Sequence, residues 1–143
     1  MKKNSTAIWH GSSREGSGEI TSQSKVLNKV AYTWSGRFDE DDAISPEELI
    51  ASAHAACFSM KFSSLLTEAG YIPDEIETTA TVTIEAGTIT QSDLVVTVKV
   101  PEISRELLTE NAEKAKNECP VSKALKAKIT MELKVESTDY ISS

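Results

Sequence analysis

The stretch "SPEELIASAHAACFSM", residues 45–60, decides the fold because it marks the start of a long helix. Ser45 stands at the N-cap position, Pro46 at the first helical position, and Glu48 three residues after the cap, which is the pattern of a capping box. The pattern predicts a central helix over about 46–69. Apolar residues cover most of the circumference of this helix, which predicts that it is buried.

Segments in which apolar and polar residues alternate lie on both sides of the helix and are typical of strands. They predict an antiparallel N-terminal meander within about 1–44 and a C-terminal strand–helix–strand part over about 75–137, together forming one domain, residues 1–143. The expected strands are 5–10, 19–27, 29–35, 75–86, 93–100 and 128–137, and the expected second helix is 104–118, which Pro120 interrupts or restarts.

The composition excludes several classes of function. Lys and Arg number 15 against 22 Asp and Glu, and the resulting charge of −7 argues against non-specific binding of nucleic acid or of an anionic membrane. No run of about 18 apolar residues is present, and no apolar stretch follows the N-terminal lysines, so we expect no membrane span, no secretion signal and a cytoplasmic location. In a reducing cytosol the two cysteines are expected to serve redox chemistry or metal binding rather than a permanent disulfide.

Cys57 lies among alanines, a phenylalanine and a methionine in "HAACFSM". One interpretation is an inert core thiol, because free cysteine is among the most buried residue types. The other is a nucleophile, which must be a thiolate, although apolar surroundings raise the pKa of a thiol. The second interpretation needs a cation from elsewhere, and Arg37 in "SGRFDED" is the candidate. The acidic neighbours of Arg37 offer it an ordinary solvent-exposed ion pair instead, so both interpretations stay open.

Cys119 directly precedes Pro120, a residue favoured at the first position of a helix. If a helical segment starts there, free backbone N–H groups near Cys119 would stabilise a thiolate; otherwise Cys119 is a small residue at a helix kink. Two cysteines far apart in sequence, one of them in apolar surroundings, suit a peroxidatic thiol and a resolving thiol. A peroxide oxidises the first to a sulfenic acid, and the second condenses with it to a disulfide.

Glu47 stands in the first turn of the central helix, ten residues before Cys57. Ten residues span about 15 Å along a straight helix, so the two side chains of one chain cannot touch. If Glu47 serves the Cys57 site, two antiparallel copies of the helix would bring them together, which points to a dimer.

Other residues around Cys57 have weaker patterns. His54 with Cys57 and Cys119 lacks both the usual zinc spacing and a fourth ligand. His54 as a general base to Cys57 lacks an orienting third residue. Trp34 and Phe38 either line an apolar pocket or belong to the core.

The combination of "SPEELIASAHAACFSM" with "ECPVSKALKAKIT" resembles the OsmC/Ohr family of thiol-dependent hydroperoxide reductases, and "YTWSGRF" is similar to its OsmC branch. The resemblance implies an α+β fold and a tightly intertwined homodimer. In such a dimer, antiparallel sheets from both chains wrap around two long central helices, and the active sites lie at the interface. The segment between Glu85 and Leu94 looks shorter than the family pattern.

The resemblance also implies roles. Cys57 matches the peroxidatic cysteine, Cys119 the resolving cysteine, and Arg37 and Glu47 the pair that activates the thiol. An apolar substrate pocket is expected from His54, Phe58, Trp34 and Phe38. The implied activity is reduction of organic hydroperoxides to alcohols in oxidative or osmotic stress defence, with no metal or organic cofactor. An external dithiol would restore the thiols, and in the Ohr branch that reductant is a lipoylated protein. The alternative is a non-catalytic dimeric module that binds an amphipathic small molecule.

Overall fold

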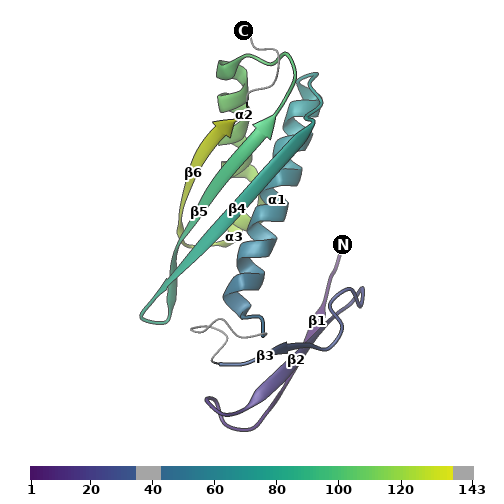
Figure 1. The fold of residues 1–143 in the computed structure, drawn as a ribbon, viewed down its shortest axis with the longest axis vertical. Coiled ribbons are helices and arrows are strands. Elements are labelled where there is room, and N and C mark those ends of the chain that lie inside the picture. Colours follow the sequence, from purple (N-terminus) through teal and green to yellow (C-terminus); the bar gives the residue numbers. More distant parts are fainter. Residues whose placement is uncertain (35–42, 137–143) are drawn as a thin grey trace. The chain divides into compact units, whose positions relative to one another are not determined.

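The computed structural model describes residues 1–34 and 43–136, and the chain forms two compact units, 1–49 and 50–143. The N-terminal unit holds three strands and the first turn of a long helix that continues into the second unit (Figure 1). In chain order the elements are β1 (Ser5–His10), β2 (Ser17–Ser22), β3 (Val30–Tyr32), α1 (Pro46–Glu68), β4 (Glu75–Glu85), β5 (Thr88–Lys99), α2 (Arg105–Glu118), α3 (Pro120–Ala124) and β6 (Lys128–Val135).

The N-terminal sheet is antiparallel with the order β1-β2-β3, which confirms the predicted meander. Its centre requires a glycine. Gly18 pairs with Trp9 on one side and Tyr32 on the other, and the two aromatic rings lie 5.3 Å apart. A Cβ at Gly18 would clash with the Ile8 carbonyl oxygen and would lie 2.6 Å from the Tyr32 ring.

Helix α1 has the predicted start and end. The Ser45 hydroxyl accepts a hydrogen bond from the backbone N–H of Glu48 at 3.1 Å, as an N-cap residue does. At the other end Gly70 adopts a φ of +98°, a left-handed conformation that suits glycine and stops the helix. Local chemistry at both ends therefore sets the length of this helix.

The second sheet has the order β4-β5-β6. Strands β4 and β5 form a hairpin whose turn residues Ala86 and Gly87 have φ values of 50° and 79°. The segment between Glu85 and Leu94 that looked short therefore consists of a tight two-residue turn and the beginning of β5. Strands β5 and β6 are parallel, which corrects the expectation of antiparallel sheets. The reason is the connection: the chain passes through α2 and α3 before β6, and such a crossover returns the next strand in the same direction.

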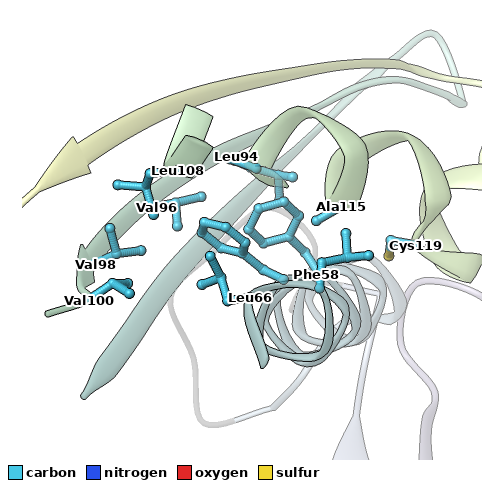
Figure 2. Close-up of a cluster of buried hydrophobic side chains, with 12 residues drawn as sticks. Phe58, Leu66, Leu94, Val96, Val98, Val100, Leu108, Ala115 and Cys119 are labelled. Carbon is cyan, nitrogen blue, oxygen red and sulfur yellow. The ribbon is translucent and has the colours of Figure 1, made fainter. Parts of the chain in front are cut away.

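The core of the second unit lies between the helices and one face of this sheet. Figure 2 shows Phe58 and Leu66 from α1 meeting β5 residues and the α2 residues Leu108 and Ala115. The β5 residues Leu94, Val96 and Val98 are two positions apart, so they share one face of the strand, and all three are at most 1% exposed. The Phe58 and Phe62 rings pack 5.5 Å apart.

Within residues 1–34 and 43–136, only one face of α1 is fully buried, whereas the sequence predicted a buried helix. Its buried side chains are His54, Phe58, Phe62, Leu65 and Leu66. Among the described residues, α1 is the one helix that is long and apolar enough to cross a membrane. One such helix does not indicate a membrane protein, because core helices of water-soluble proteins meet the same criteria. Its exposed apolar residues among the described ones are Ala53, Ala56 and Met60, and Met60 is 74% exposed.

Candidate active site

The structure brings the two cysteines together. Cys57 lies half-buried on α1, and Cys119 lies fully buried between α2 and α3. Both are free thiols, and their side chains lie next to each other. Two thiols in contact can be joined by a disulfide when an oxidant is supplied.

The position of Cys119 follows from the proline after it. Cys119 ends α2, where its N–H donates to the Ala115 carbonyl at 3.0 Å, and it is also the N-cap of α3, which begins at Pro120. Of the two alternatives for Pro120, interrupting or restarting the helix, the structure shows the restart. The free amides of α3 do not act as we expected, however. The N–H of Val121 donates to the sulfur of Cys57, on the neighbouring helix.

The surroundings of Cys57 act on its pKa in opposite directions. Burial is the largest influence and raises the pKa of the thiol, while the hydrogen bond from the Val121 N–H lowers it. The Cys119 thiol raises the pKa further, and the net shift is upward. The described residues therefore favour the protonated form, and a nucleophilic Cys57 needs a positive charge. Arg37, the predicted source of that charge, lies outside the described residues.

His54 lies one turn before Cys57 on α1 and is fully buried. Its Nδ1 is 2.7 Å from the hydroxyl oxygen of Ser92 on β5, and its Nε2 is 2.8 Å from that of Ser122 on α3. Burial lowers the pKa of the imidazole, so the ring is neutral, with one nitrogen donating and the other accepting. Both nitrogens are thus engaged, which leaves none to act as a base toward Cys57.

Three residues near the cysteines were missed by the sequence reasoning: Ser92, Ser122 and Val121. The signal for Ser122 was present in "CPVS", because a residue three positions after Cys119 shares its helix face. Ser92 had no such local signal, since it reaches His54 from a strand 38 positions away.

The other predicted site residues are placed as follows. Glu47 is half-buried in the first turn of α1, and Phe58 is fully buried in the core. Trp34 lies in the N-terminal unit, where the Arg14 guanidinium stands 4.9 Å from its ring centroid. Trp34 lines a hollow of about 280 Å³ together with Trp9, Ser13, Tyr32, Thr33 and Pro46. Phe38, like Arg37, lies outside the described residues, and the roles of all these side chains stay predictions.

Metal ligands were a further alternative for His54 and the cysteines. Within residues 1–34 and 43–136, no three His, Cys, Asp or Glu side chains come close enough to hold a metal ion.

Two free thiols in contact at a helix junction, on an α+β fold, define a two-cysteine thiol protein. Residues 39–134 match the family described as OsmC-like protein. The chain is 42% identical over 141 residues to Peroxiredoxin OsmC of Escherichia coli, covering 96% of this chain and 99% of that protein. The chain belongs to the OsmC family, which confirms the resemblance seen in the sequence.

More distant proteins share the fold. The chain is 29% identical to "Organic hydroperoxide resistance protein-like 1" of Staphylococcus saprophyticus, over 85% of this chain and 89% of that protein. An OsmC-like protein from Mycoplasma pneumoniae superposes with a TM-score of 0.77 at 14% identity, covering 94% of this chain and 97% of that one. An organic hydroperoxide resistance protein from Elizabethkingia anophelis gives 0.68 at 25% identity, covering 96% and 99%. The α+β fold is therefore that of OsmC-like proteins.

Proposed function

We propose that this protein reduces organic hydroperoxides to alcohols, with Cys57 as the peroxidatic thiol and Cys119 as the resolving thiol. The observation that carries the proposal is the contact between these two thiols, one on the long helix α1 and the other at the start of the short helix α3. Conversion of such a pair to a disulfide requires no large rearrangement, because the two side chains already lie next to each other.

The class of enzyme rests on the relatives. Both Peroxiredoxin OsmC proteins are 42% identical to the chain over 96% of its length, and the chain is accordingly a cysteine-based peroxidase. The names of the Staphylococcus and Elizabethkingia proteins refer to organic hydroperoxides, which supports that substrate class over hydrogen peroxide. Because the chain belongs to this class of enzyme, we prefer the peroxidase to the alternative of a non-catalytic binding module.

The reaction has two chemical steps. The thiolate of Cys57 attacks the distal oxygen of ROOH, the O–O bond breaks, and the alkoxide takes a proton and leaves as the alcohol. Cys57 is then a sulfenic acid. The sulfur of Cys119 attacks the sulfur of Cys57, and hydroxide leaves with the thiol proton as water. An external dithiol reduces the disulfide, and a lipoylated protein is our candidate for this reductant.

The first step needs an activated thiolate, because burial raises the pKa of Cys57. Arg37 would stabilise the thiolate and orient the peroxide, and Glu47 would hold the arginine. Since Glu47 and Cys57 are about 15 Å apart along α1, a second copy of the chain would supply this pair, in a homodimer. The uncovered apolar face of α1 supports such an assembly. We place the enzyme in the cytoplasm, in defence against oxidative or osmotic stress.

The substrate class is tested by single-turnover consumption of cumene hydroperoxide and of hydrogen peroxide by the reduced protein. We expect the organic peroxide to react faster, and we expect Cys57→Ser to consume neither. Faster reaction with hydrogen peroxide would reject the substrate class. Consumption by Cys57→Ser at the wild-type rate would reject the assigned nucleophile.

A further inference from the structure

A buried imidazole joins the three elements that surround the cysteine pair. His54 on α1 contacts the hydroxyl of Ser92 on β5 at 2.7 Å and the hydroxyl of Ser122 on α3 at 2.8 Å. The ring is 0% exposed, and Ser92 is equally buried. A buried polar bridge of this kind is kept only where each partner is satisfied, and here both ring nitrogens have one.

The bridge is in register with the two thiols. His54 lies three residues before Cys57 on α1, and Ser122 lies three residues after Cys119, so each spacing is about one helical turn. The contact between His54 and Ser122 therefore lies one turn away from the contact between Cys57 and Cys119. On the other side of the thiols, Lys61 and Glu118 form an ion pair at 3.5 Å. Both of its side chains are substantially exposed, and such pairs contribute little.

Helix α3 depends on such a contact for its position. It has only five residues, and a helix of that length is not stable without packing. Its first turn carries Cys119 and the Val121 N–H that donates to Cys57. Ser122 is the one buried side chain of α3. The hydrogen bond between His54 and Ser122 is thus a second polar contact, besides that of the Val121 N–H with Cys57, that holds this turn against α1.

We propose that His54 is a positioning residue for disulfide formation. Through Ser122 it holds the first turn of α3 so that Cys119 stays within reach of the Cys57 sulfenic acid. Ser92 contacts the other ring nitrogen, from β5, and is not required for this positioning. This inference rests on the proposed function, because it concerns the step in which Cys119 attacks Cys57–SOH, an S–S bond forms, and the S–O bond breaks with release of water.

The two sides of the bridge can be separated by matched variants. Ser122→Ala removes the partner on α3, and Ser92→Ala removes the partner on β5. At the histidine itself, glutamine places an amide nitrogen where Nε2 stands and so can keep the bond to Ser122. Asparagine places one where Nδ1 stands and keeps only the bond to Ser92. Each of the four variants loses one buried hydrogen bond. We therefore expect Ser122→Ala and Ser92→Ala to show similar drops in thermal midpoint, and His54→Asn and His54→Gln likewise.

The experiment follows the reduced full-length variants after one equivalent of cumene hydroperoxide. Trapping with a sulfenic-acid reagent gives the rate of the first step, and loss of free thiols gives the rate of disulfide formation. The readout is the ratio of the second rate to the first. We expect this ratio to fall by at least about tenfold in Ser122→Ala and His54→Asn, since small misplacements of reacting groups cost that much. It should stay near the wild-type value in Ser92→Ala and His54→Gln.

The positioning role of His54 would be overturned if the two serine variants had equal rate ratios and the two histidine variants did too. This holds whether the ratios of both members of a pair fall or stay at the wild-type value. If the wild-type protein forms Cys57 sulfenic acid but no disulfide, the proposed resolving role of Cys119 and this inference fail together. If the wild type forms the disulfide and the pairs do not differ, only this inference fails. Thermal midpoints of all four variants separate loss of folding from loss of the step.

Discussion

The surroundings of Cys57 shift the pKa of its thiol in opposite directions. Burial raises the pKa of its thiol, and a backbone N–H from α3 lowers it, with a net upward shift. A peroxidatic role for this residue therefore depends on a cation that the residues described around it do not supply. The proposed source is Arg37, and this dependence can be measured.

Replacing Arg37 by methionine keeps the length of the side chain and removes its charge. We expect the pH profile of single-turnover cumene hydroperoxide reduction to move to higher pH, because the thiolate fraction rises as pH passes the pKa of Cys57. Each unit of that shift lowers the rate at neutral pH by about tenfold. Arg14→Met is the matched control, because it makes the same substitution at a different arginine, one that lies over the Trp34 ring. An unchanged profile in Arg37→Met would rule out the arginine as the activating cation.

His54 makes stability depend on pH. Burial lowers its pKa below the ordinary 6.5, so between the folded value and 6.5 the unfolded chain binds more protons than the folded chain. The free energy of unfolding is therefore full above about pH 6.5 and falls as pH decreases below it. Urea unfolding at about pH 7.5 and about pH 5.5 should show this loss in the wild type and a smaller loss in His54→Gln. An equal loss in both proteins would contradict the assignment.

At the scale of single elements, α1 is set by its ends. Ser45→Ala removes the hydroxyl that accepts from the Glu48 N–H, and we expect a loss of about 1 kcal/mol in the free energy of unfolding. Ser64→Ala, at an exposed position within the same helix, is the control and should change stability little or raise it slightly. Denaturant unfolding of both variants makes the comparison. Equal stability of the two would show that the cap contributes nothing.

Features that depend on neighbouring residues could be predicted from the sequence, and features that depend on the path of the whole chain could not. The start of α1 at Pro46, its end before Gly70 and the restart at Pro120 were predictable, because each depends on residues within one turn. The parallel pairing of β6 was not, because strand direction depends on the path of the whole crossover. The same holds for the bridge of His54, whose partners lie 38 and 68 positions away. The contact between the two thiols could likewise be seen only in the fold, although the residues next to each cysteine had singled it out as a candidate.

At the scale of the whole molecule, one face of α1 carries apolar side chains that the described residues leave exposed. Alanines there allow a second helix to approach closely, and Met60 stands out from them at 74% exposure. A charge at this position would be buried in the proposed homodimer without a partner, which costs about 3–5 kcal/mol. Nothing comparable is expected at Ile72, which is 75% exposed beyond the end of α1.

We therefore expect Met60→Glu to sediment as a monomer and to lose peroxidase activity, and Ile72→Glu to keep both the dimer and the activity. Analytical ultracentrifugation over a range of protein concentrations makes the comparison, with circular dichroism to verify folding. A dimeric and active Met60→Glu protein would place the interface elsewhere. Loss of the dimer in both variants would show that the effect is not specific to the exposed face of α1.

The central claim is that Cys57 is oxidised first and Cys119 resolves it, and intact-mass spectrometry after one equivalent of cumene hydroperoxide tests it most directly. The account predicts that the wild type loses two hydrogens as the disulfide forms, that Cys119→Ser gains one oxygen at Cys57, and that Cys57→Ser is unchanged. Oxidation of Cys57→Ser at Cys119, with Cys119→Ser left unmodified, would contradict the account by reversing the two roles.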